Sequence, residues 1–194
     1  METSEARDHL QWVHGILRTA DRSLHIPPVT LIAWGLFGTI VNALHQATAS
    51  GMTVPRDRVF QLPLMVLAIV VSVWAASRGL VERKTLVDSN AGVVFWVVFG
   101  VLMLVNLTAQ DTVVPFRAMA LFWCIGFGIA LLVVGIQSSR PLWIGGAMMV
   151  AASAAAGHIP GWFDGMLALG WALGFVGPGL VLALEGTNGR TAVI

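Results

Sequence analysis

Charged residues are scarce in this sequence. Aspartate, glutamate, lysine and arginine together make up 11% of its 194 residues, whereas a soluble globular domain carries about 25%. Hydrophobic residues make up 57%, so too few ionic groups remain to give a folded chain of this size a water-facing surface. The scarcity of charge excludes an ordinary soluble domain and predicts that the apolar excess faces lipid.

Other residues and patterns are also missing. The sequence has no tyrosine, and its one cysteine, Cys124, excludes an intrachain disulfide and is expected to be a small buried hydrophobe. No basic tract accompanies the net charge of +1, so a nucleic-acid partner is not expected. The first ten residues are polar and lack a signal-peptide pattern. Membrane insertion is therefore expected to depend on later helices.

Catalytic and metal-binding motifs are absent. There is no G-x-S-x-G, Walker loop, H-x-x-x-H or C-x-x-C, and no pair of carboxylates inside an apolar run. Ser72 and Ser153 each stand without a neighbouring base that would activate a hydroxyl nucleophile. We therefore expect no catalytic residue, no metal site and no cofactor, and an enzyme is the less favoured interpretation.

What the sequence does contain is long apolar runs. A helix needs about 20 apolar residues to cross a bilayer, and a backbone in lipid must satisfy its own hydrogen bonds. A transmembrane barrel would require alternating polar and apolar residues, which these runs lack. The six runs are Pro28–Ala47, Val59–Ser77, Ala91–Ala109, Val114–Ile136, Pro141–Gly157 and Gly161–Leu184.

The predicted fold class is all-α: a polytopic transmembrane bundle of six helices preceded by an amphipathic interfacial helix. Short connections between the runs predict three antiparallel hairpins. Residues 1–27 are predicted to be the cytoplasmic or interfacial segment, 28–184 the transmembrane domain and 185–194 a short cytoplasmic tail.

Basic residues are distributed unequally between the two sides of this bundle. Because cytoplasmic connections are enriched in lysine and arginine, the bias predicts a multi-pass protein of the cytoplasmic (inner) membrane with both termini in the cytoplasm. The side of the termini carries Arg7, Arg18, Arg22, Arg78, Arg83, Lys84, Arg140 and Arg190, and the other side carries Arg56, Arg58 and Arg117.

The segment Ser4–Leu24 has the pattern of an amphipathic helix. Its apolar residues recur at spacings of three and four, and its charged residues fall on the opposite side. Pro27 and Pro28 end it, because proline disfavours helical geometry in the preceding residue. Two interpretations stay open: a helix lying flat in the headgroup region, or a docking helix for a protein partner. The apolar positions are Leu10, Val13, Leu17, Ala20 and Leu24.

Two aromatic motifs occur twice. W-x-x-F-G begins at Trp34 and again at Trp96, and W-x-x-G-F begins at Trp123 and again at Trp171. The spacing favours parallel repeats of a hairpin, with compositional coincidence as the alternative. Inverted repeats, which many secondary transporters have, are not seen.

Tryptophans near the predicted span ends have the distribution of an interfacial belt. These are Trp34, Trp74, Trp96, Trp143 and Trp162. Trp123 and Trp171 lie deeper in their runs and are expected to pack between helices.

Small residues are expected to hold the last two helices together, because close backbone approach replaces the hydrophobic effect between helices in lipid. Ala147, Ala151 and Ala155 recur every four residues in the fifth run, and Gly170 and Gly174 do so in the sixth. These small faces are predicted to meet. In the same helix, Pro178 is predicted to introduce a bend.

Polar residues gather at the predicted outer ends of the helices. This layer is a candidate ligand pocket, with polar helix ends meeting water as the alternative. His45 and His158 could bind a metal or haem iron, although their separation in the sequence gives no ligand motif. Arg117 is expected to reach the interface or to pair with an aspartate. The candidates are Asn42, His45, Asn106, Asp111, Arg117, His158 and Asp164.

Two stretches resemble a group of uncharacterised bacterial six-helix integral membrane proteins that begin with an amphipathic helix. They are ARDHLQWVHGILRTADRSLHIPPVTLIAWGLFG, from Ala6, and LFWCIGFGIALLVVGIQSSRPLWIGGAMMVAASAAA, from Leu121, with DGMLALGWALGFVGPGLVLAL following. The resemblance extends over nearly the whole chain and rests on composition and helix spacing. It implies six helices and assigns no catalytic or binding residue.

Together these patterns favour an integral membrane protein without a catalytic site, acting as an accessory, sensor or regulatory subunit. Its expected partners are the lipid bilayer and a protein bound through the N-terminal helix. A small transporter or channel lined by Asn42, Asn106 and Arg117 is the alternative, followed by a haem- or quinone-binding membrane protein.

Overall fold

The computed structural model describes residues 27–53, 57–82, 97–105 and 115–191. Their regular structure is entirely helical, and no strand occurs among them. Six helical segments coincide with the six predicted apolar runs, which confirms the all-α class. They are α2 (Pro28–Ala49), α3 (Asp57–Glu82), residues 97–105, α5 (Phe116–Ser138), α6 (Arg140–His158) and a final segment made of η1 (Pro160–Trp162), α7 (Phe163–Trp171), η2 (Ala172–Val176) and α8 (Gly177–Thr191).

Prolines mark the starts of these helices. Pro28 is in the first turn of α2, Pro141 in that of α6 and Pro160 in that of η1. Pro115 directly precedes α5. Proline suits these positions because its fixed φ matches a helix and its missing N–H would have no partner in the first turn.

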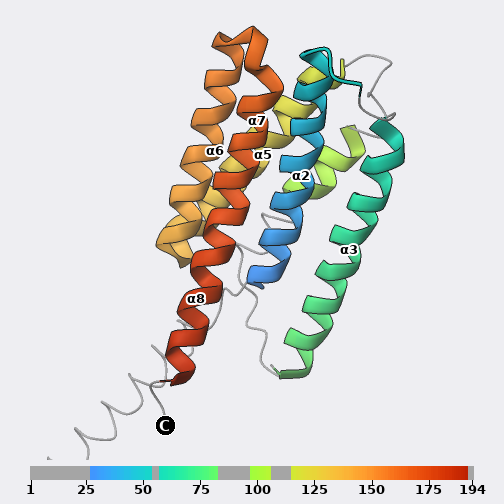
Figure 1. Cartoon of the computed structure of the whole chain (residues 1–194). Coiled ribbons are helices and arrows are strands. Elements are labelled where there is room, and N and C mark those ends of the chain that lie inside the picture. Colours follow the sequence, from blue (N-terminus) through green and yellow to red (C-terminus); the bar gives the residue numbers. More distant parts are fainter. Residues whose placement is uncertain (1–26, 54–56, 83–96, 106–114, 192–194) are drawn as a thin grey trace, which may run out of the picture.

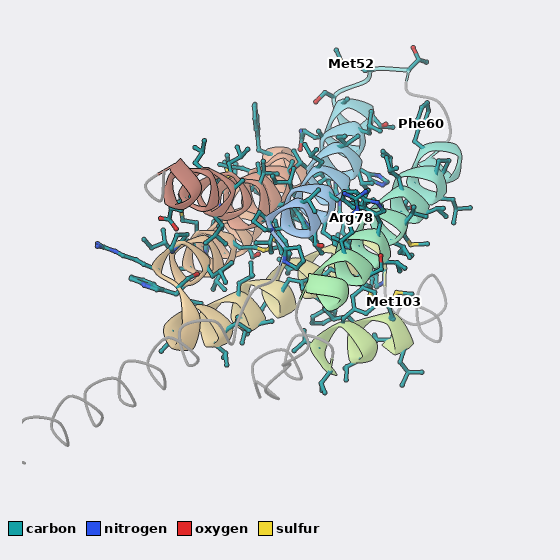
Figure 2. All side chains as sticks on the ribbon, turned by 90° about the horizontal axis from the view of Figure 1, so that it is seen from below. Met52, Phe60, Arg78 and Met103 are labelled. Carbon is teal, nitrogen blue, oxygen red and sulfur yellow. The ribbon has the colours of Figure 1, made fainter. Side chains whose placement is uncertain are left out.

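The helices form one bundle in which α2 is central (Figure 1). One side of α2 packs on α3, and another packs on α7, η2 and α8. α5 packs along α6, which in turn contacts α7. Seen along the bundle, α3 and residues 97–105 lie at one edge (Figure 2). The predicted N-terminal amphipathic helix falls in residues 1–26, outside the described residues.

Three of the described helices are long and apolar enough to cross a membrane: Pro28–Ala49, Arg117–Ile136 and Pro160–Glu185. A shorter apolar stretch, Phe60–Ala75, lies in α3, and large apolar side chains such as Val66 and Val73 are exposed there. A continuous apolar surface of this kind is stable against lipid rather than water. These helices identify a membrane protein.

Glycines bring the α5 and α6 backbones into direct contact. A Cβ on Gly146 would lie 2.6 Å from the carbonyl oxygen of Gly128, and one on Gly135 would overlap the backbone of Trp143. No side chain fits at either position. This contact, which the sequence analysis did not single out, gains its dispersion energy from backbone atoms at van der Waals distance.

The predicted contact between the last two helices is confirmed for one partner and wrong for the other. Gly170 and Gly174 do face α6, where a Cβ on either would lie about 3 Å from Ala152 or Met149. The α6 residues at this interface are not the Ala147, Ala151 and Ala155 stripe, of which Ala151 is exposed. The buried positions are Leu142, Gly145, Gly146, Met149, Ala152, Ser153 and Ala156. They fall on one broad stripe of α6, which contacts α5 along one edge and α7 along the other.

The sequence predicts a bend at Pro178, and the structure has a π-helical turn just before it. Residues Ala172–Val176 are π-helical, and the Gly177 N–H donates to the carbonyl of Ala172. Proline lacks an N–H and its ring clashes with the carbonyl four residues earlier, so one wide turn just before it adjusts the helix. Pro178 is buried against Gly145 of α6.

We expect Gly135→Ala to lower the free energy of unfolding by about 1–3 kcal/mol, because the methyl group would force the α5 and α6 backbones apart. Reversible unfolding in mixed micelles measures this. Gly157→Ala is the matched control, since nothing lies within 4 Å of a Cβ at Gly157. Equal stabilities of the two variants would contradict the proposed backbone contact.

Candidate functional site

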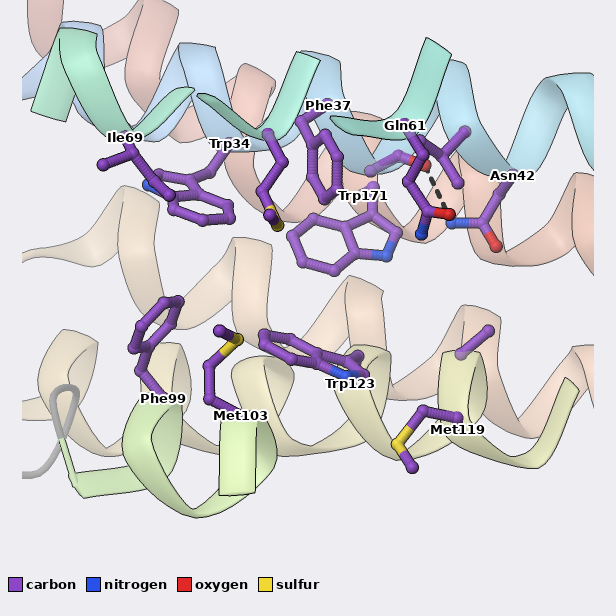
Figure 3. A pocket seen from close by; sticks show the side chains of 14 residues that line it. Trp34, Phe37, Asn42, Gln61, Ile69, Phe99, Met103, Met119, Trp123 and Trp171 are labelled. Carbon is purple, nitrogen blue, oxygen red and sulfur yellow. Dashed lines mark hydrogen bonds between the residues drawn. The ribbon is translucent and has the colours of Figure 1, made fainter. Parts of the chain in front are cut away.

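A cavity lies between α2, α3, residues 97–105, α5 and α7 (Figure 3). Its volume, counted as the space that the centres of water molecules can occupy, is about 100 Å³. Like other small-molecule sites, it is lined mainly by apolar and aromatic side chains. The lining residues are Trp34, Phe37, Gly38, Val41, Asn42, Gln61, Met65, Ile69, Phe99, Met103, Met119, Ala120, Trp123 and Trp171.

Aromatic rings in edge-on and tilted contact connect the two sides of the cavity (Figure 3). Ring centroids lie 5.5 Å apart for Trp34 and Phe99, and 5.9 Å apart for Phe99 and Trp123. Phe127 continues the chain of contacts to Trp123 and Trp171, at 5.5 and 5.6 Å. Each such contact stabilises the fold by about 0.5–1.5 kcal/mol beyond the effect of burial, so these rings are packed against one another.

Residues of the two repeated motifs meet at the cavity. Trp34, Phe37 and Gly38 of the first W-x-x-F-G motif and Phe99 of the second line the cavity, as do the tryptophans of both W-x-x-G-F motifs, Trp123 and Trp171. The prediction that Trp123 and Trp171 pack between helices is confirmed. Trp34, predicted for an interfacial belt, instead packs between helices.

Trp34 is held in place by a hydrogen bond. Its indole N–H donates to the Ser72 hydroxyl on α3 at 2.9 Å, and that hydroxyl donates to the carbonyl of Ala68 at 2.7 Å. The hydroxyl thereby satisfies both the indole and its own proton inside an apolar environment. This bond ties the cavity wall on α2 to that on α3.

The cavity is elongated along the helices and has one polar end (Figure 3). On α2 its lining runs from Trp34 to Asn42, and on α3 from Ile69 to Gln61. Each pair is eight residues apart, which corresponds to about 12 Å at the rise of an α-helix. Asn42 and Gln61 lie together at one end, and Trp34, Ile69 and Phe99 lie at the other.

Asn42 has an unsatisfied acceptor at the polar end. Its Nδ2 donates to the carbonyl of Gly38 at 2.7 Å, whereas its Oδ1 is buried and has no hydrogen-bond partner. The residue is 5% exposed. Exchanging the oxygen and nitrogen would put two acceptors together at Gly38, so the hydrogen bond fixes the orientation of the amide. A buried acceptor without a donor costs about 1–3 kcal/mol.

Gly38 leaves room for the Trp171 ring, which lines the cavity. A Cβ at this position would overlap the indole ring of Trp171, which is 3% exposed. The glycine of the W-x-x-F-G motif therefore lets Trp171 pack directly on the α2 backbone. This contact sets the position of the ring at the cavity.

Among the predicted site residues, Asn42 lines the cavity. His45 is partly buried on α2, and His158 is exposed at the end of α6. Asn106 and Asp111 lie outside the described residues. No group of three or more histidine, cysteine, aspartate or glutamate side chains that could hold a metal ion occurs within residues 27–53, 57–82, 97–105 and 115–191.

Arg117 and Asp164 are brought together at the first turns of α5 and α7. Arg117 Nη2 lies 3.5 Å from Asp164 Oδ2, and the guanidinium lies 5.6 Å from the Phe163 ring centroid. The side chain of Arg117 is 57% exposed and that of Asp164 is 4% exposed. Asp164 Oδ1 has no hydrogen-bond partner among the described residues. This partial pairing joins two elements and leaves a buried carboxylate with one weak counterion.

At the same end of the bundle, Gln46 of α2 forms hydrogen bonds with η1 and α7. Its Nε2 donates to the carbonyl of Gly161 at 2.9 Å, and its Oε1 accepts from the N–H of Gly165 at 3.0 Å. Lower on the same face, Thr39 donates to the carbonyl of Ala168 at 3.4 Å. Polar residues of α2 therefore link it to η1 and α7.

Sequence reasoning missed most of the cavity lining. Gln61, Met65, Met103 and Met119 gave no pattern that separates a lining residue from an ordinary apolar one. The repeated aromatic motifs were the usable signal of the cavity, since Trp34, Phe37, Phe99, Trp123 and Trp171 from these motifs line it. A comparison with protein-family models, curated proteins and solved structures finds no match.

We expect Arg117→Ala to destabilise the protein by about 1–3 kcal/mol, because the buried Asp164 carboxylate would lose its counterion. Asp164→Asn in that background should recover most of the loss, since a neutral amide tolerates the site better. Unfolding of both single variants and the double variant in mixed micelles measures the coupling. Strictly additive effects would show that the two side chains do not interact.

Proposed function

We propose that this chain is a multi-pass protein of the cytoplasmic membrane that crosses the bilayer six times with both termini in the cytoplasm. The three helices long enough to span support this, as does the coincidence of six helical segments with six apolar runs. The excess of basic residues on the side of the termini supports the orientation.

We infer further that the protein is a sensor or accessory subunit, without catalysis, that holds a lipid-soluble small molecule among its helices. The cavity lined by three tryptophans carries this inference. Rigid aromatic rings supply a large contact area at a low cost in conformational entropy. Methionines, such as Met103 and Met119 on the same side of the cavity as Trp123, adapt to irregular shapes. The arrangement suits recognition of an apolar molecule.

A site of this kind converts ligand occupancy into a change of helix packing. The cavity separates α3 and α2 on one side from residues 97–105 and α5 on the other (Figure 3). A ligand that contacts both sides stabilises the conformation it binds by its differential affinity. A protein partner that reads the spacing of these helices would then respond to the ligand.

Benzene is a suitable probe, because an apolar cavity of about 150 Å³ holds one such ring and this cavity, of about 100 Å³, also opens at its mouth. We expect saturable binding to protein in lipid nanodiscs, above the amount taken up by empty nanodiscs, in equilibrium dialysis. Ala120→Phe should weaken this binding about tenfold, a loss of about 1.4 kcal/mol, because Ala120 lines the cavity and the larger ring would fill it.

The matched control is Ala154→Phe, which adds the same ring at an exposed position of α6. It should bind benzene like the wild-type protein. If the wild-type protein takes up no more benzene than empty nanodiscs, or if both variants bind like wild type, the proposed ligand site is wrong.

The orientation is testable by cysteine labelling in a Cys124→Ala background, which removes the one native thiol. Ser50 and Gly161 are exposed at the predicted outer side, and Ser77 is exposed near the inner end of α3. We expect a membrane-impermeant maleimide to label Ser50→Cys and Gly161→Cys in intact cells. Ser77→Cys should be labelled only after the cells are permeabilised. The reverse pattern would place the termini outside.

A further inference from the structure

The size of the cavity limits the class of ligand that it can hold. On the basis of the proposed ligand-binding function, we propose that its ligands are neutral aromatic molecules of one ring, and that the side chain of Met103 sets this upper limit. The volume of the cavity, the fixed positions of its tryptophans and the place of Met103 in its lining each bear on this assignment.

The volume of the cavity leaves room for a single ring. The centres of water molecules can occupy about 100 Å³ of it, whereas an apolar cavity of about 150 Å³ holds one benzene molecule. One ring therefore fills this cavity up to its mouth, and a second fused ring has no space. None of the lining residues carries an ionisable side chain, so a charged ligand would lose its hydration without gaining a counterion.

Two of the tryptophans that line the cavity are held in position by contacts outside it. Trp171 lies against the α2 backbone at Gly38 and stacks on Phe175, with ring centroids 5.2 Å apart. The indole N–H of Trp34 donates to the Ser72 hydroxyl. A larger ligand would have to break these contacts before it could widen the cavity, because close-packed side chains have no empty space to move into. The rings therefore define fixed walls.

Met103 is the lining residue whose removal would enlarge the cavity without disturbing these walls. It lies about one helical turn after Phe99, on the side of the cavity that carries Trp123 (Figure 3). The ring contacts that join Trp34, Phe99 and Trp123 do not involve it. Truncation of one large core side chain to alanine leaves a cavity that can hold about one benzene ring. Met103→Ala should therefore provide the space for a second ring.

The test compares benzene with naphthalene, which adds one fused ring of the same chemistry, by equilibrium dialysis against the full-length protein in lipid nanodiscs. After correction for uptake by empty nanodiscs, we expect the wild-type protein to bind benzene about tenfold more tightly, because the second ring overpacks the cavity. Met103→Ala should reduce this preference to about onefold. Met103→Leu should keep it, since leucine and methionine have similar volumes.

Met148→Ala is the matched control. It makes the same substitution at a side chain of α6 that is 40% exposed and lies outside the cavity, so the preference for benzene should be unchanged. Thermal unfolding in nanodiscs shows whether each variant is folded. If Met103→Ala is not, the smaller truncation Met103→Val takes its place and should reduce the preference in part.

The outcomes separate the two levels of inference. Uptake of benzene no greater than that of empty nanodiscs would remove the ligand site itself, and the size limit with it. Binding of naphthalene to the wild-type protein as tightly as benzene would leave a ligand site and overturn the limit of one ring. A full preference for benzene in the folded truncated variant would overturn the assignment of that limit to Met103.

Discussion

The close approach of helix backbones at glycine is the contact on which the rest of the structure depends. In lipid there is little hydrophobic force to bring helices together, so packing at van der Waals distance must supply the attraction. Gly128, Gly135 and Gly146 join α5 to α6, and Gly174 joins the final helix to α6. α2 joins this unit through Gly38, where the Trp171 ring lies on its backbone. The positions of Trp123 and Trp171 at the cavity follow from these contacts.

The cavity exists because large rings and absent side chains are combined at one level of the bundle. Packed aromatic contacts run from Trp34 through Phe99 to Phe127 and connect the two sides of the cavity. The absence of a side chain at Gly38 leaves room for the Trp171 ring against the α2 backbone. Void space among apolar side chains costs dispersion energy. Its retention beside an unpartnered amide oxygen is the kind of local inconsistency that marks functional sites in otherwise well-packed proteins.

The helices were predictable from the sequence, and their rotations were not. Apolar runs between prolines such as Pro28 and Pro160 gave the segments to within a few residues, because lipid requires continuous helical hydrogen bonding. Which face of a helix is buried depends on its neighbours, so the stripe through Ala151 was assigned to the wrong interface and Trp34 to the membrane surface. Asn42 was recognised as a candidate because polar residues gather at the predicted outer ends of the helices. Its partners in the cavity could not be identified, since Gln61 and Met103 are distant in sequence and follow no motif.

The bond between Trp34 and Ser72 bears on how a molecule enters. It is a side-chain hydrogen bond that joins α2 to α3, and such bonds between membrane helices contribute only about 0.6–2 kcal/mol. α3 lies at the edge of the bundle (Figure 2), so outward movement of this one helix would uncover the cavity from the side. A molecule dissolved among the acyl chains would then arrive without crossing water. Its occupancy would depend on its concentration in the bilayer rather than in the surrounding solution.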